Sequence, residues 1–524
     1  MVQAQATLAL DDQLAAGWFG WLTNKGILKL NAILCLSLIS SYATGYDGSM
    51  MNGLQSLDTW KAAFNNPDAN KLAILNAIQN IGQLAALPFC AWFCDKYGRR
   101  PGLVVGATIM LLGVGLQGGA RNTGMFIAAR GILGFGLALN ITAAPVLIME
   151  LAYPTQRAPM VSIYNTLWGL GALSAAWITY GTFRINSDWA WRIPSILQAL
   201  SSFLQLGLCF LIDESPRWLV TQEREPEAEK LLIKYHANGD SNNPAVAVEM
   251  EEIRTAIRLE YDAMNSTSYL SFFKTKGNRH RFFFIILAVG FFSQWSGNGL
   301  ISYYLTLILN SIGYRAQETQ TLINALLTVW GLFWGVVFSL LVNRIPRRAL
   351  FLFSTLGSLA TYVVWTALEA TYEMSTDLNE DGTGGPSGIA KGVLAMIFLF
   401  NVFFTAGWGV LQVTYVVEIL PFNLRARGLV LYNLFVACAL IFNQYANPIG
   451  VTNSGWKYYI TYDVWLAVEA IVVYFLFVET RGLSLEETAL VLDGPEMGDK
   501  LVGEVLKNTE KTVQVIETEK RGSI

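Results

Sequence analysis

Two ionisable residues lie within long apolar runs, where charge is costly. Asp47 falls inside the first run, and Arg130 lies near the middle of the fourth. An ionised side chain at bilayer depth is normally paired or faces a water-filled cavity. A neighbouring arginine favours the carboxylate, whereas desolvation favours the neutral acid. Asp47 could therefore change its protonation state, and the alternative is a fixed structural ion pair with Arg130.

Gln294 and Asn298 form a second pair of residues that could bind a ligand. Their spacing of four residues places both side chains on one face of a helix. Amides both donate and accept hydrogen bonds, as a polyhydroxylated ligand requires, and aromatic rings offer flat apolar faces. The alternative is a structural role, because buried amides often hydrogen-bond between neighbouring helices.

The elements that carry these residues are long enough to cross a membrane. Hydrophobic residues make up 53% of the chain and charged residues 14%, whereas an average soluble domain is roughly a quarter charged. Charge gathers in short clusters between apolar runs of about 20 residues, the length that spans about 30 Å of hydrocarbon. We expect an all-α integral membrane protein with about twelve spans. They run near 28–48, 72–93, 101–120, 125–149, 160–182, 193–212, 282–310, 318–342, 349–369, 391–418, 428–448 and 457–478.

A polar stretch of mixed charge separates the first six spans from the second six. It is typical of short amphipathic helices at a membrane surface. We therefore divide the chain into segment 1–27, a first bundle 28–212, a linker 213–281, a second bundle 282–478 and a tail 479–524. The loop 370–389 is acidic and rich in glycine, and we expect it and the charged tail to be solvated.

Lysine and arginine predict the orientation. Most of them fall on the side that also holds the linker and both termini, which the positive-inside rule makes cytoplasmic. Several other functions are excluded. Five cysteines lie in or beside apolar runs, two histidines lie in charged stretches, and we see no metal site, nucleotide-phosphate loop, nucleic-acid stripe, signal peptide or nucleophile–base set. We expect neither an enzyme nor a cofactor. Gly134 and Gly136 indicate close helix packing.

The two halves repeat each other. Asp95-Lys-Tyr-Gly-Arg-Arg after the second span is similar to Asn343-Arg-Ile-Pro-Arg-Arg after the eighth. Glu150 with Arg157 is matched by Glu418 with Arg425, and Glu214 after the sixth span by Glu479 after the twelfth. Parallel six-span repeats are typical of one transporter architecture, with the substrate bound at the midplane between the halves.

The ordered motifs resemble the sugar porters of the major facilitator superfamily over about residues 28–494. A single match would be weak evidence, whereas the ordered set is strong. The motifs are Gly45-Tyr-Asp-Gly, Asp95-Lys-Tyr-Gly-Arg-Arg, Arg130-Gly-Ile-Leu-Gly-Phe-Gly, Pro145-x4-Glu150-x6-Arg157, Glu214-Ser-Pro-Arg-Trp-Leu, Gln294-Trp-Ser-Gly-Asn-Gly-x3-Tyr-Tyr, Glu418-x6-Arg425 and Glu479-Thr-Arg-Gly. The sequence around Gln294 and Gln412 resembles that of the fungal lactose and cellodextrin permease branch.

The resemblance implies roles for individual residues. It assigns the proton to Asp47 and makes Arg130 its partner, and it implies an extracellular gate at Tyr303 and Tyr304. It adds Asn165 and Asn324 to Gln294 and Asn298 as sugar ligands. The tenth-span Trp that stacks on monosaccharides in relatives falls on Val413, so Trp408 and Gln412 are candidates to replace it, together with Tyr415. A family Asn likewise falls on Gly299. A wider pocket would suit a disaccharide.

The charged clusters on the cytoplasmic side could act as a latch that biases a two-state equilibrium, besides enforcing topology. Its members are Asp95, Arg99, Arg100, Glu150, Arg157, Arg347, Arg348, Glu418 and Arg425.

Together these patterns predict two pseudo-symmetric six-helix bundles that import a sugar with a proton by alternating access, with Asp47 wet and titratable beside a central cavity. The partners expected are a small-molecule sugar, a proton and the lipid bilayer, and we expect the chain to act as a monomer in the plasma membrane. Two alternatives remain open. They are a sugar sensor of transporter fold with little or no transport, and a hexose facilitator without proton coupling.

Overall fold

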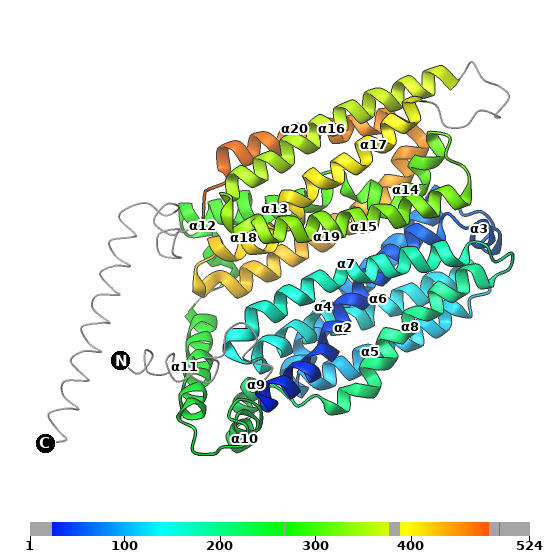
Figure 1. The fold of residues 1–524 in the computed structure, drawn as a ribbon. Coiled ribbons are helices and arrows are strands. Elements are labelled where there is room, and N and C mark those ends of the chain that lie inside the picture. The colour runs from blue at the N-terminus through cyan, green and yellow to red at the C-terminus, as the bar shows by residue number, and fades with distance from the viewer. Residues whose placement is uncertain (1–23, 267, 377–387, 482–491, 493–524) are drawn as a thin grey trace, which may run out of the picture.

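The computed structural model describes residues 24–266, 268–376, 388–481 and 492. The regular elements in these ranges are helices, and the long helices lie side by side in two bundles (Figure 1). Most of segment 1–27, the part of the acidic loop at 377–387 and most of the tail after 481 lie outside the described residues.

The first bundle follows the first six apolar runs. Its long helices are α2 (Lys25–Leu54), α4 (Ala69–Tyr97), α5 (Arg99–Gly118), α6 (Thr123–Leu151), α7 (Arg157–Thr182) and α8 (Trp189–Leu208), and the short α3 (Asp58–Ala63) connects α2 to α4. Asn24, Asp68 and Asn122 cap three of these helices. Each side chain accepts a hydrogen bond from the backbone amide three residues on, at 2.8 to 3.2 Å.

The second bundle follows the remaining runs, but two of its spans are interrupted where the sequence predicted continuous helices. The continuous ones are α15 (Gln317–Leu341), α16 (Arg347–Thr376), α19 (Phe422–Ser454) and α20 (Lys457–Leu476). The seventh span consists of a π-helical turn η5 (Arg281–Leu287), α13 (Ala288–Trp295) and α14 (Asn298–Ser311). Gly297 separates the last two with φ 93°, a conformation that favours glycine. The tenth span consists of α17 (Gly388–Phe404), the π-helical η7 (Thr405–Gly409) and α18 (Gln412–Ile419).

Within the described part of the chain, eleven helices are long and apolar enough to cross a membrane. The helix α7 is long enough at 26 residues but less apolar. It packs along α2 in the first bundle and against α15 of the second, so its neighbours are membrane-spanning helices. With α7 included, the architecture matches the twelve spans expected from the sequence.

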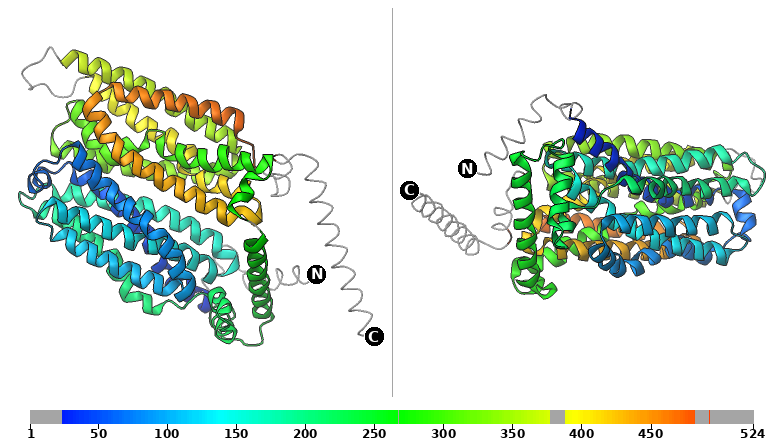
Figure 2. Two further views of the ribbon diagram at one scale, coloured as in Figure 1. Left: turned by 180° about the vertical axis from the view of Figure 1, so that it is seen from behind. Right: turned by 90° about the horizontal axis from the view of Figure 1, so that it is seen from below.

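The linker contains α9 (Pro216–Thr221), α10 (Glu225–Tyr235), α11 (Pro244–Ser266) and α12 (Lys276–His280). Figure 2 shows that α9, α10 and α11 lie at one end of the bundles, away from α3. We call these two ends the linker end and the α3 end. The bundles meet along α4 against α19 and α7 against α15, with α2 also reaching α14.

Candidate functional site

Asp47 and Arg130 lie together in the interior of the first bundle. Arg130 Nη1 is 3.5 Å from Asp47 Oδ1, and the arginine and aspartate side chains are 3% and 1% exposed. Gln79 joins them, because its Nε2 donates to Asp47 Oδ2 and its Oε1 accepts from Arg130 Nη2. Arg130 Nε donates to the carbonyl of Leu75 at 2.8 Å. The carboxyl group therefore faces an arginine and an amide, and not lipid.

Close helix packing holds this group in place. Gly134 on α6 lies directly against the backbone carbonyl of Gln79 on α4, where a Cβ atom would collide. Gly45 on α2 lies in the same way against the carbonyl of Trp168 on α7. Small residues at helix crossings let two backbones approach closely in a membrane protein. Glycines of the first and third motifs thus hold α2 against α7, and α6 against α4, around the charged group.

The expectation that Asp47 is wet is wrong for this conformation. Its side chain is 1% exposed, and its carboxyl group contacts Arg130 and Gln79. A buried charge is tolerated when such partners satisfy it. Proton exchange at Asp47 therefore requires a second conformation, in which the surrounding helices admit water.

Sequence reasoning missed Gln79 and its neighbour Asn80. Gln79 touches both charged residues, and Asn80 Nδ2 donates at 2.6 Å to Gln444 Oε1 on α19 of the other bundle. The signal was available, because Asn76, Gln79 and Asn80 interrupt an otherwise apolar run at helical spacing. Adjacent residues of α4 thus contact the charged group and the second bundle.

The four expected sugar ligands lie on four helices of three spans: Asn165 on α7, Gln294 on α13, Asn298 on α14 and Asn324 on α15. Gln294 ends the α13 side of the break and Asn298 begins α14, so a continuous helix does not place them on one face as the spacing predicted. Asn298 Oδ1 is buried with no hydrogen-bond partner among the described residues. Asn324 on α15 likewise has a buried Nδ2 without a partner there, and its Oδ1 accepts from Asn52 Nδ2 at 3.0 Å. Asn165 on α7 is exposed.

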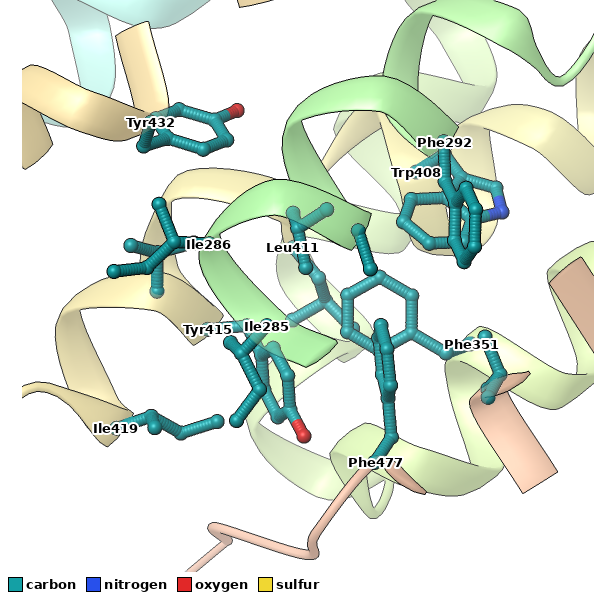
Figure 3. Close-up of a cluster of buried hydrophobic side chains, with 14 of the residues drawn as sticks. Ile285, Ile286, Phe292, Phe351, Trp408, Leu411, Tyr415, Ile419, Tyr432 and Phe477 are labelled. Carbon is teal, nitrogen blue, oxygen red and sulfur yellow. The ribbon is translucent and has the colours of Figure 1, made fainter. Parts of the chain in front are cut away.

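In the described conformation, Trp408 lies in the protein core. Its side chain is fully buried in the core of the second bundle, packed against Phe292 and Phe351, and its Nε1 donates to Thr355 Oγ1 at 3.1 Å (Figure 3). Tyr415 is fully buried in the same cluster. We therefore leave both out of the site proposed below.

Gln412 keeps a partly exposed position at the start of α18, where its Oε1 accepts from the Tyr432 hydroxyl at 2.9 Å. Val413 beside it is 50% exposed. The position of the family tryptophan therefore carries a small, accessible side chain.

The two bundles are joined at the α3 end. Asn52 on α2 makes three hydrogen bonds to the second bundle: Nδ2 donates to the Ile301 carbonyl at 3.2 Å and to Asn324, and Oδ1 accepts from the Leu305 amide at 3.2 Å. Gln55 donates to the Tyr303 carbonyl at 3.0 Å, and Ser56 lies 3.2 Å from Thr306. Each of these partners except Asn324 belongs to α14, so α14 closes this end.

The aromatic pair Tyr303 and Tyr304 lies on the same half-helix. Tyr304 is fully buried, and its hydroxyl donates to the Gln444 carbonyl. Tyr303 is partly exposed. Near them, Asn443 and Asn447 on α19 form an amide group that sequence reasoning missed. Asn443 Nδ2 donates to the Gln294 carbonyl at 2.9 Å, and Asn447 Nδ2 donates to Asn443 Oδ1 at 2.7 Å.

The charged clusters at the linker end form ion pairs within each half. Arg99 contacts Glu150 at 3.2 Å and Asp95 at 3.7 Å, and Arg347 contacts Glu418 at 3.1 Å. The repeat extends to the backbone. Glu214 accepts from the amides of Arg99 and Arg100, and Glu479 accepts from those of Arg347 and Arg348, at 2.8 to 3.1 Å.

The remaining members of the expected latch have other partners. Arg157 pairs with Glu249 of the linker at 3.0 Å and not with Glu150, while Arg425 Nη2 donates to the Leu420 carbonyl at 3.5 Å. A network between the halves would need the linker end to close, and it stays a prediction.

Comparisons with known proteins agree with this architecture. Residues 32–492 match the protein family described as "Sugar (and other) transporter". An MFS-type transporter of Aspergillus cristatus is 28% identical over 461 residues, which cover 87% of this chain and 91% of that protein. A high-affinity glucose transporter of Kluyveromyces lactis is 28% identical over 486 residues, covering 88% and 84%. A probable quinate permease of Aspergillus clavatus is 27% identical over 489 residues, covering 87% and 86%.

Solved structures share the fold. The xylose transporter XylE from E. coli in an inward-open conformation superposes with a TM-score of 0.69 at 21% sequence identity, covering 88% of this chain and 100% of that chain. Its partially occluded inward-open form gives a TM-score of 0.68 at 20% identity, covering 87% and 99%.

Proposed function

Because the chain belongs to the Sugar (and other) transporter family, we propose that it is not an enzyme but a carrier that moves a sugar and a proton together across a membrane. The observation that carries the proton part is the buried group of Asp47, Gln79 and Arg130. A purely structural ion pair would not need its bridging amide to sit next to a residue that contacts the other bundle. Here the bridging amide is Gln79, and the next residue, Asn80, binds Gln444 on the other bundle.

Alternating access links this group to transport. In the conformation described, Asp47 is sealed and the α3 end is closed by α14. When the bundles rock apart at the α3 end, water reaches Asp47 and protonates it. A neutral Asp47 no longer holds Arg130 by charge, so the α2–α4–α6 contact relaxes and the bundles can return with the proton and sugar bound.

The sugar binds between the bundles. Asn298 and Asn324 each present a buried amide atom with no partner in the described part of the chain, and Asn165 is exposed on α7. A buried unpaired polar atom is costly, and a sugar hydroxyl would satisfy it. Gln294 lies just before the break of the seventh span, and its backbone carbonyl accepts a hydrogen bond from Asn443.

We propose a disaccharide such as lactose or cellobiose as the substrate. Val413 stands at the position of the family tryptophan and is half exposed, while Trp408 is sequestered in the core. A site that lacks this stacking ring has room for a second sugar unit. One of the relatives named above is a high-affinity glucose transporter, so a hexose is the competing substrate.

The linker end is the cytoplasmic side, because most basic residues outside the spans gather there. The described conformation then faces inward, with its extracellular side closed. The chain imports its substrate at the plasma membrane, acting as a monomer.

Uptake of radiolabelled sugars by a transporter-null host tests this function. Lactose, cellobiose, glucose and xylose are compared, with quinate as a non-sugar. We expect concentrative uptake of at least one disaccharide by the parent, loss of accumulation with retained exchange in Asp47→Asn, and parental behaviour in Asp58→Asn, an exposed control on α3. Full accumulation by Asp47→Asn would refute proton coupling. Absence of uptake for every sugar, in a chain that still binds sugar, would favour a sensor.

A further inference from the structure

Two buried carboxyl groups that the proposed transport cycle does not use contact serines on either side of α14, one just before the break that precedes this helix and one at its last residue. Ser296, immediately before the break, lies with its Oγ 2.9 Å from Glu469 Oε2 on α20. Ser311, the last residue of α14, lies with its Oγ 2.5 Å from Glu369 Oε1 on α16. Glu469 is fully buried and Glu369 is 3% exposed. We call these two serine–carboxyl contacts the clasps.

The surroundings of the clasps differ from those of Asp47. The described groups that face Glu469 are Ser296 and the indole of Trp465 on its own helix. Those that face Glu369 are Ser311 and Trp365, with Glu373 on the same helix and Tyr459 on α20. No lysine or arginine is among these described neighbours. Acids at bilayer depth that lack a basic partner are expensive as anions and are functional candidates.

Counting hydroxyl protons shows what the clasps require. Ser296 Oγ lies within hydrogen-bond distance of the Phe292 carbonyl as well as of Glu469, and Ser311 Oγ lies 2.7 Å from the Ile308 carbonyl as well as close to Glu369. A serine hydroxyl has one proton to donate. With an ionised carboxylate, one contact in each clasp therefore lacks a donor. A protonated carboxyl supplies it, because it donates to the serine oxygen while the serine donates to the carbonyl.

We propose that Glu369 and Glu469 are positioning residues that hold α14 against the second bundle while they carry protons and release it when they lose them. Because α14 supplies most of the contacts that close the α3 end, the clasps set how easily that end opens. Gly297, in its left-handed conformation, lies between the Ser296 clasp and α14, so this clasp fixes the backbone just before the break and the Ser311 clasp holds α14 itself. The inference rests on the alternating access proposed above. It adds that the clasps of α14 sense protons separately from Asp47.

Thiol labelling of a cysteine at Thr306 tests the clasps without requiring transport. Thr306 is 4% exposed and contacts Ser56 across the bundle interface, so Thr306→Cys reacts with a maleimide only when the α3 end opens. The purified full-length chain in detergent is used, and labelling of the chain without the added cysteine is subtracted. Asp58→Cys, on the exposed face of α3, reports the pH dependence of the reagent itself.

We expect the labelling rate of Thr306→Cys, relative to Asp58→Cys, to rise between about pH 5 and about pH 8, by about fivefold for each hydrogen bond lost, equivalent to about 1 kcal/mol. Glu369→Gln with Glu469→Gln should keep the low-pH rate throughout, because a glutamine amide donates to serine at any pH. Glu369→Leu or Glu469→Leu should give the fast labelling rate at every pH, so only the glutamine variants should keep the α3 end closed.

The proposal is overturned if the double glutamine variant keeps the parental pH dependence. It is also overturned if Asp47→Asn alone abolishes that dependence, since the titrating group would then be Asp47. If the glutamine variants do not fold, Ser296→Ala and Ser311→Ala test the same contacts from the other side. They should label fast at about pH 5, and an unchanged rate would contradict the clasps. None of these results depends on whether a sugar is carried.

Discussion

Asn52 is the residue whose removal should shift the balance between the closed and open α3 end most clearly. Its side chain is 4% exposed and makes three hydrogen bonds to the second bundle, two to backbone groups of α14 and one to Asn324. Asn52→Ala leaves the Ile301 carbonyl, the Leu305 amide and Asn324 Oδ1 without these partners. All of these bonds break in any motion that separates α2 from both α14 and α15.

The expected shift follows from the number of bonds. A hydrogen bond contributes about 0.5–1.5 kcal/mol net, so three bonds favour the closed state by about 2 kcal/mol or more. Since about 1.4 kcal/mol corresponds to a factor of ten, opening should become about 25-fold more favourable. The labelling rate of Thr306→Cys measures this equilibrium directly, because Thr306 is buried only while the α3 end is closed.

Asn186→Ala is the matched control, because Asn186 lies at the same end of the molecule in the exposed turn between α7 and α8. It should leave the labelling rate unchanged. A rate for Asn52→Ala that stays within about twofold of the parent would refute the conclusion that these bonds hold the α3 end closed.

Three further predictions concern single side chains. Gln79→Leu removes both bridging hydrogen bonds of the charged group, so sugar accumulation should be lost and the melting temperature should fall by several degrees. Gln205→Leu, at a buried amide that bonds Ser40 and Asn140 instead, should retain accumulation, and coupled uptake by Gln79→Leu would contradict the bridging role. Trp408→Phe should lower the free energy of unfolding by about 1–3 kcal/mol, because its indole packs in the core. The order of sugar preference should stay unchanged, and a changed preference would show that Trp408 takes part in sugar binding. Burial opposes ionisation of Asp213, but hydrogen bonds from Lys234 and Tyr235 outweigh it and lower the pKa of Asp213. The stability advantage of the parent over Asp213→Asn should therefore be full above about pH 3.9 and disappear as the pH falls through the lowered pKa. Thermal melts at several pH values measure this difference in stability, and a difference that does not change with pH would contradict the pairing.

The bundle architecture could be predicted from the sequence because a membrane imposes run length, and because the two halves repeat Glu150 with Arg157 as Glu418 with Arg425. The proximity of Asp47 and Arg130 could be predicted for a similar reason, since two opposite charges in apolar runs have few other ways to be satisfied.

What could not be predicted depends on local backbone and packing. Periodicity gave Gln294 and Asn298 one helix face, but the left-handed Gly297 interrupts the helix between them. Trp408 read equally well as a ligand-stacking ring or as core, and only its contacts with Phe292 and Phe351 decide between them. Gln79 was missed, because its role depends on the two charged residues that folding brings to it.

Proton movement measured in proteoliposomes tests the central claim most directly. The purified chain is reconstituted with a pH-sensitive dye inside the vesicles, and a sugar that the uptake panel identifies as a substrate is added outside without an imposed proton gradient. Our account predicts acidification of the lumen by the parent and by Asp58→Asn, and sugar exchange without acidification by Asp47→Asn. Sugar entry into parental vesicles with no pH change, or acidification by Asp47→Asn equal to that of the parent, would contradict it.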